Sequence, residues 1–246
     1  MIKIQSLATV ILGLTTVAIM GCSDSKKDPV SSTDFTTKAI VADFVTLADG
    51  KTVNFKATFS NDDDNIELTD GDIVTVENGP TEVGLVAKKN SNGTYSYENN
   101  VPATQDLGLI NYNFSRVELE DAELSPINLP DFFLINSPAS STTVNNPMTI
   151  SWDDTGDNTD TIEFYFTYDC RNQAGDFISS SWKLEVNETG QHDFDFDDAP
   201  KTSGMSSCTV NVLVTRSATG NVADQFKGGS NTSKQQRSLT GITLNL

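Results

Sequence analysis

The segment MTISWDDTGDNTDTIEFYFTYDC, residues 148–170, decides the fold class of this 246-residue chain. Two short runs, Met148–Trp152 and Ile162–Cys170, flank a polar, acidic loop, and no long stretch of the chain shows helical periodicity. Short runs separated by Gly, Asn, Asp and Pro about every ten residues are typical of an antiparallel β-sandwich. The sequence therefore predicts an all-β protein.

Outward from this segment, the second half of the chain holds seven expected strands. They are Phe133–Ile135, Met148–Trp152, Ile162–Cys170, Ser180–Val186, Asp193–Asp197, Cys208–Ser217 and Gln236–Leu246. The first half holds seven more, namely Lys38–Leu47, Lys51–Phe59, Asp72–Val76, Glu82–Lys88, Thr94–Glu98, Leu107–Phe114 and Val117–Leu119. Ser125-Pro126 and Leu129-Pro130 interrupt the pattern and favour a short, stiff join between domains. We expect two tandem antiparallel β-sandwich domains, residues 34–127 and 131–246.

The second domain resembles fibronectin type III and related immunoglobulin-like domains. The resemblance rests on Met148–Trp152 and on the aromatic run Ile162–Phe166, which correspond to the B and C strands of that fold. It implies seven strands named A, B, C, C′, E, F and G, with Trp152 filling the core. It implies a fold and not a function.

Cys170 and Cys208 form an even pair in a chain that we expect to be exported, which predicts a disulfide; two free buried thiols are the alternative. In the implied topology Cys170 ends strand C and Cys208 begins the neighbouring antiparallel strand F. The two residues then lie at the same pole, where a bridge is geometrically natural.

The N-terminus resembles a bacterial lipoprotein signal. A positive start and an apolar stretch precede Ile19-Met20-Gly21-Cys22, in which a small residue stands directly before the cysteine. The resemblance implies a signal peptide over residues 1–21, lipidation of Cys22 and a flexible tether over residues 22–33. In such lipoproteins an Asp directly after the cysteine favours retention in the inner membrane. Ser23 stands at that position here, so the resemblance implies the outer membrane without specifying which of its faces. An ordinary secretory leader is the alternative.

Composition excludes several classes of function. The formal net charge is −18, which repels nucleic-acid phosphates. His192 is the single histidine, so multi-histidine metal sites are excluded, and no nucleophile or phosphate-loop motif is present. We expect no catalytic residue and no resident cofactor other than a possible Ca²⁺ ion.

The loop between strands B and C is the candidate Ca²⁺ site. Its oxygen ligands are Asp153, Asp154, Asp157 and Asp160, but flanking helices and the terminal bidentate Glu of an EF-hand are missing. A solvated acidic loop is the alternative. The B–C and E–F loops lie at opposite poles of the implied fold, so these aspartates and Asp197–Asp198 cannot share one site.

The connection between strands F and G, residues 218–235, is expected to be a long loop with a basic character. The cations on it and at its base are Arg216, Lys227, Lys234 and Arg237. It either packs against the first domain or the Asp153–Asp160 loop, or it contacts a partner.

These expectations together indicate a non-catalytic, lipid-anchored envelope protein that binds or scaffolds an envelope or surface protein. One alternative is a Ca²⁺-dependent carbohydrate or matrix binder. A second is a glycan hydrolase with paired carboxylates, although nothing in the sequence singles out such a pair.

Overall fold

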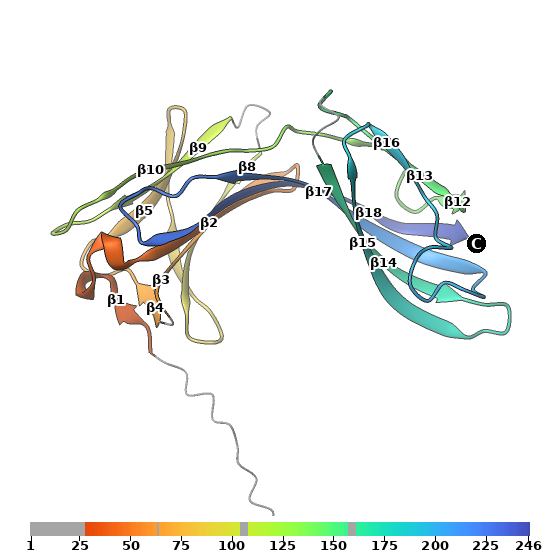
Figure 1. Ribbon diagram of the computed structural model, residues 1–246, viewed down its shortest axis with the longest axis horizontal. Coiled ribbons are helices and arrows are strands. Elements are labelled where there is room, and N and C mark those ends of the chain that lie inside the picture. Colours follow the sequence, from red (N-terminus) through yellow and green to blue (C-terminus); the bar gives the residue numbers. More distant parts are fainter. Residues whose placement is uncertain (1–27, 63, 104–107, 157–160) are drawn as a thin grey trace, which may run out of the picture.

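The computed structural model describes residues 28–62, 64–103, 108–156 and 161–246, and Figure 1 shows them as two lobes built from strands. Among these residues the helical elements are two single turns, Ser32–Asp34 and Thr37–Ala39. Most strand pairs are antiparallel, so the prediction of an all-β, sandwich-like fold is confirmed.

The second lobe is a sandwich of two sheets. One sheet has the order β11-β13-β16, and the other continues as β18-β17-β14-β15, with β12 beside β18. The strands are β11 (Ile135–Ser137), β12 (Thr143–Asn145), β13 (Met148–Trp152), β14 (Thr161–Arg171), β15 (Phe177–Asn187), β16 (Gln191–Phe194), β17 (Ser207–Gly220) and β18 (Gly228–Asn245). This is the A-B-E and C′-C-F-G order expected of an immunoglobulin-like domain.

Alternation along β14 fills the core of this lobe. Phe164 and Phe166 point inward and lie 4.7 and 4.9 Å from the ring of Phe194 in the opposite sheet, measured between ring centroids. Trp152 is buried and its ring lies 5.1 Å from that of Phe164. The predicted role of Trp152 as a core residue is therefore confirmed.

The predicted disulfide is also present. Cys170 of β14 pairs directly with Cys208 of β17, and their Cα atoms are 4.0 Å apart. The disulfide links two adjacent strands of one sheet, and its cysteines are 38 residues apart in the sequence.

The first lobe is a second sandwich. One of its sheets has the order β7-β8-β3-β2 with β4 and β1 at its margin, and the facing sheet has the order β10-β9-β5-β6. The strands are β1 (Val30–Ser31), β2 (Val41–Ala48), β3 (Thr52–Asn61), β4 (Asp64–Glu67), β5 (Ile73–Asn78), β6 (Thr81–Gly84), β7 (Val86–Lys89), β8 (Tyr95–Pro102), β9 (Leu109–Ser115) and β10 (Ala122–Asn128). Stacked rings join the two sheets, with Phe44 4.5 Å from Tyr112 and Phe59 5.0 Å from Phe114.

Strands β17 and β18 form a long hairpin that leaves the second lobe and enters the first (Figure 1). Beyond Thr215, the described pairing of β17 is with β18. Gly228–Gln235 of β18 then pair in parallel with β2, so one continuous eleven-stranded sheet spans both lobes. The prediction that residues 218–235 form a long loop is wrong except for residues 221–227, which connect the two strands.

The polar character of this stretch explains the error. The inward-facing row of β18 is Asn231, Ser233 and Gln235, which are 2%, 0% and 5% exposed. The Asn231 amide donates to the carbonyl of Ser125 at 3.1 Å, and the Ser233 hydroxyl donates to the carbonyl of Asn128 at 2.6 Å. A strand that buries polar side chains lacks the apolar alternation by which strands are found in sequence.

The tip of the hairpin completes the core of the first lobe. Phe226 is 6% exposed, and its ring lies 5.7 Å from Phe114, 6.1 Å from Phe44 and 6.3 Å from Phe59. Apart from Ala223 and Phe226, the buried residues of the first core end at Leu129 in the sequence, and those of the second core begin at Phe133. The first lobe therefore depends on residues that follow most of the second lobe in sequence.

One strand near the join also differs from expectation. Val117–Leu119 are not a strand, whereas residues 122–128 form β10 and include Pro126, which was expected to belong to the join. β10 is the outer strand of its sheet, so its proline can lack a ladder N–H without loss of a hydrogen bond.

Candidate functional site

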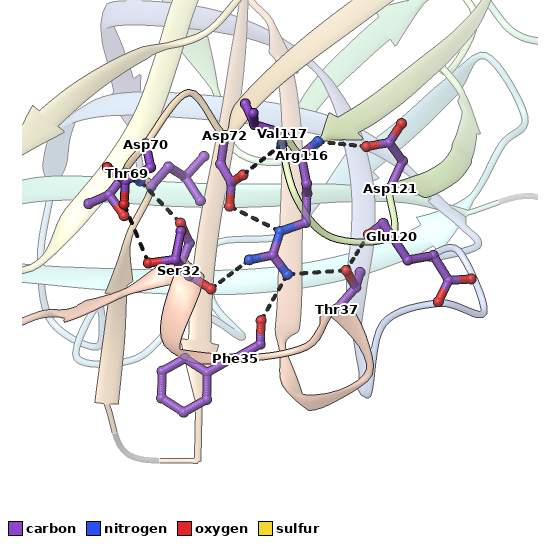
Figure 2. Close-up of polar contacts among 12 residues, drawn as sticks. Ser32, Phe35, Thr37, Thr69, Asp70, Asp72, Arg116, Val117, Glu120 and Asp121 are labelled. Atoms are coloured by element: carbon purple, nitrogen blue, oxygen red, sulfur yellow. Dashed lines mark hydrogen bonds and ion pairs between the residues drawn. The ribbon is translucent and has the colours of Figure 1, made fainter.

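The most buried charged group of the first lobe is Arg116, which follows β9 directly. Figure 2 shows its guanidinium enclosed between Asp72 and the N-terminal segment. The side chains of Arg116 and Asp72 are 0% and 3% exposed, and Arg116 Nε lies 3.0 Å from Asp72 Oδ2. Such a pair is stable only when hydrogen bonds satisfy the remaining donors.

Those donors point at the segment that enters the lobe from the N-terminus. Arg116 Nη1 donates to the carbonyl of Phe35 at 2.9 Å and to Thr37 Oγ1 at 3.2 Å. Nη2 donates to the carbonyl of Ser32 at 2.6 Å. This Arg116 cluster therefore fixes the point at which the expected tether joins the folded protein.

No sequence pattern singles out Arg116. The residue is a single cation after an apolar strand, and its partner Asp72 lies among several other acidic residues. Neither the spacing nor the residue types distinguish this pair from solvated surface charges.

The second lobe has a comparable Arg216 cluster. Arg216 Nε donates to Glu188 Oε1 at 3.1 Å, and the indole N–H of Trp152 donates to the same oxygen at 2.7 Å. The guanidinium also contacts the carbonyls of Asp131 and Asp153 and lies 4.6 Å from the ring centre of Phe133. Arg216 thus ties the join between the lobes to the second core.

Arg237 extends this contact towards the first lobe. Its guanidinium carbon lies 4.5 Å from the ring centre of Phe132, and Nε donates to the carbonyl of Phe133 at 2.8 Å. The same guanidinium lies against Gly50 in the β2–β3 turn, where an added Cβ atom would be only 3.0 Å from the guanidinium carbon. Burial lowers the pKa of Arg237.

The two lysines of the basic group lie on the part of the hairpin that enters the first lobe. Lys227 Nζ is 2.5 Å from Asp62 Oδ1, and Lys234 stands opposite Leu47 in the β18–β2 ladder. The four predicted cations do not form one site. They lie along the hairpin, and three of them make contacts that hold the lobes together.

The candidate Ca²⁺ loop is described only in part, because Asp157 and Asp160 lie outside the described residues. Asp153 accepts hydrogen bonds from the Asn136 amide and the Leu134 N–H, both at 3.0 Å. These hydrogen bonds lower the pKa of Asp153, and the bond from Asn136 has the larger effect. Asp154 accepts from the N–H of Gly156. Both carboxylates therefore accept hydrogen bonds, Asp153 from the segment at the start of β11 and Asp154 from within the loop, and Ca²⁺ binding stays a prediction.

Within the described ranges, no group of three or more His, Cys, Asp or Glu side chains is arranged to hold a metal ion. The β13–β16 register places Gln191 opposite Ser151 and Phe194 opposite Met148. The loops after Trp152 and after Phe194 consequently leave from opposite ends of the lobe, as expected.

An apolar hollow of about 330 Å³ lies between the two sheets of the first lobe. Its described lining is Phe55, Val76, Asn78, Thr81, Val83, Val101 and Pro102. The lining holds no ionisable group among these residues, so it offers shape and apolar surface and no acid–base chemistry.

Cys22 lies outside the described residues. In the part of the chain that the structure describes, no helix is long and apolar enough to cross a membrane.

No protein-family model matches the chain, and no curated protein matches it either. Among solved structures, a titin I67–I69 variant shares 10% identity at a TM-score of 0.26, covering 83% of this chain and 65% of that one. A titin A168–A169 fragment shares 9% identity at a TM-score of 0.25, covering 81% and 95%. The FN1–FN3 domains of chicken CNTN1 share 12% identity at a TM-score of 0.22, covering 78% and 63%. At scores this low, the fold assignment rests on the strand order and register described above.

Proposed function

We propose that this chain is a non-catalytic, lipid-anchored protein of the bacterial outer membrane that holds a partner at a fixed geometry. Cys22 carries the lipid, and residues 22–33 form a tether to the folded part. The partners are the membrane, through the lipid, and an envelope or surface protein. Nucleic acid is not a partner, because the net charge of −18 repels phosphates.

The β17–β18 hairpin is the observation that carries the proposal. Domains in one chain normally move relative to each other unless a large interface joins them. Here the strands themselves continue from one lobe into the other, and the tip residue Phe226 is part of the first core. Two lobes joined in this way form a rigid arm, which suits a scaffold better than a flexible pair of modules.

The use of buried charge also supports a structural role. Arg116 donates to Asp72 and to backbone carbonyls, and Arg216 donates to Glu188 and to backbone carbonyls. Groups paired in this way hold segments of the backbone in place.

Fatty-acid labelling of growing cells tests the anchor. We expect an alkyne-labelled fatty acid to become attached to the unmodified chain but not to the Cys22→Ala variant. The unmodified chain should fractionate with the outer membrane. The Ser23→Asp variant should keep the label and move to the inner membrane, whereas Ser23→Ala should behave like the unmodified chain. Labelling of Cys22→Ala would refute the anchor.

Distances between the lobes test the arm. Spin labels on cysteines that replace Asn92 and Gln173, one in an exposed turn of each lobe, should give a single narrow distance distribution. A broad distribution, as given by two domains on a flexible linker, would contradict the rigid arm while leaving the anchor unaffected.

A further inference from the structure

Strand β15 forms one end of the sheet that spans both lobes. It has eleven residues, all paired in regular antiparallel register with β14. Among the residues that the structure describes, no strand pairs with its outer edge. A long, regularly paired edge strand of this kind leaves a row of backbone N–H and C=O groups open to another strand.

The other outer strands of the described sheets are short or interrupted. β10 contains Pro126 and a register shift between Ala122 and Ser125. β7 has four residues, of which Lys88 and Lys89 are two. β1, β6, β11, β12 and β16 have between two and four residues each. Among these strands only β15 is longer than seven residues, and it has no proline, no bulge and no inward-facing charge, which are three of the usual protections of an edge.

Backbone parity shows which residues of β15 present their hydrogen-bonding groups at the edge. The Cα separation of 4.0 Å identifies Cys170–Cys208 as a non-hydrogen-bonded pair, since those pairs are the closer ones. The backbone groups of Cys170 therefore point away from β17, towards its other neighbour Ile178. Alternation along β15 then turns the N–H and C=O groups of Ser181, Lys183 and Glu185 outward.

Side chains on both faces of β15 are also incompletely covered. Ile178, Trp182, Leu184 and Val186 pack against the second core but stay half-buried. On the other face, Lys183 Nζ lies 2.7 Å from Glu163 Oε2, and Glu185 accepts a hydrogen bond from Thr161 at 2.6 Å. Glu163 and Glu185 are direct cross-strand neighbours, so these two carboxylates share one neighbouring lysine, Lys183.

We propose that β15 pairs antiparallel with β15 of a second copy of this chain, about a two-fold axis through Leu184. This register sets Lys183 opposite Glu185 of the second copy on both sides of the axis, and Trp182 opposite Val186. Opposite charges and aromatic–β-branched pairs are favourable cross-strand neighbours. The second lysine supplies the cation that Glu185 lacks.

Charge distinguishes this register from its neighbours. An axis through Lys183 places the two lysines directly opposite each other, and an axis through Trp182 places Lys183 opposite Ser181, so that no opposite charges face each other. The overall charge of −18 opposes association, but at ~0.15 M salt it is screened beyond ~8 Å, while groups in contact still interact.

Cysteine cross-linking of the full chain in the cells that produce it tests the axis. In Leu184→Cys the two thiols face each other in a non-hydrogen-bonded pair, and oxidation should give a disulfide-linked dimer. Ser181→Cys is the matched control, because Ser181 lies opposite Asn187 of the second copy and should not cross-link to itself. The unmodified chain controls for Cys22. A dimer from Trp182→Cys but not from Leu184→Cys, or equal cross-linking of Ser181→Cys, overturns the proposed pairing.

Charge reversal of the purified full chain in detergent gives a second test by sedimentation. Lys183→Glu and Glu185→Lys should each reduce the dimer fraction at least several-fold. The double variant restores opposite charges across the axis and should recover it. A monomer at every accessible concentration, or a dimer that the single reversals leave unchanged, refutes the proposal without bearing on the anchor or the rigid arm.

Discussion

Arg116 and Arg216 occupy equivalent roles in their lobes, although they lie on unrelated elements. Each guanidinium is paired with one buried carboxylate and donates to backbone carbonyls of another segment. Arg116 holds the entry of the chain into the first lobe, and Arg216 holds the join between the lobes. A planar group with several donors suits this task because it can bind several carbonyls at once.

Arg116→Met should lower the free energy of unfolding by about 3–5 kcal/mol, because Asp72 would be left buried without its counter-charge. The N-terminal segment around Ser32 should become open to proteolysis at the same time. Urea denaturation and limited proteolysis measure the two effects. The control Arg171→Met removes an exposed arginine and should cost less than ~1 kcal/mol. Equal losses in the two variants would show that burial of Arg116 is unimportant.

At the scale of the element, the β17–β18 hairpin decides how the lobes are joined. Its entry into the first lobe depends on Gly229, which has a φ of 136° in the β18–β2 ladder. A Cβ atom at this position would lie 1.8 Å from the carbonyl oxygen of Ala42. Only glycine allows the two parallel strands to approach this closely.

Gly229→Ala should therefore separate β18 from β2 and destabilise the protein by at least ~2 kcal/mol, from steric overlap and backbone strain. Hydrogen exchange should show faster exchange of the amides of β2. The matched control is Gly84→Ala, because a Cβ atom at Gly84 meets nothing within 4 Å. Unchanged exchange in β2 would mean that the parallel pairing contributes little.

At the scale of the whole molecule, the position of Phe226 couples the two lobes. Phe226 belongs to the first core, but it is carried by strands that begin and end in the second lobe. The two tryptophans of the chain, Trp152 and Trp182, both pack in or against the second core. Tryptophan fluorescence consequently reports unfolding of the second lobe alone.

Phe226→Ala should remove about 3–5 kcal/mol from the first core and, through the hairpin, lower the midpoint of the tryptophan transition. Fluorescence and far-ultraviolet circular dichroism recorded along one denaturation series should give coincident midpoints. Phe177→Ala, at an exposed phenylalanine of the second lobe, should shift both by much less. A tryptophan transition that ignores Phe226→Ala would show that the lobes unfold independently.

The sequence by itself determined the strands whose inward row is apolar. Met148–Trp152 and Ile162–Cys170 alternate between core and solvent, and this local pattern identifies a strand whatever lies beside it. The order of the second sandwich, the role of Trp152 and the Cys170–Cys208 disulfide all followed from that pattern and the resemblance that it carries.

Only the tertiary structure decided what joins the lobes. Asn231, Ser233 and Gln235 form a buried strand because the carbonyls of Ser125 and Asn128, more than a hundred residues earlier, accept hydrogen bonds from the first two. The pairing of Arg116 with Asp72 likewise depends on enclosure by the Ser32–Phe35 segment. A polar side chain shows no preference for burial in its own sequence, because burial is favourable only when distant groups supply its hydrogen bonds.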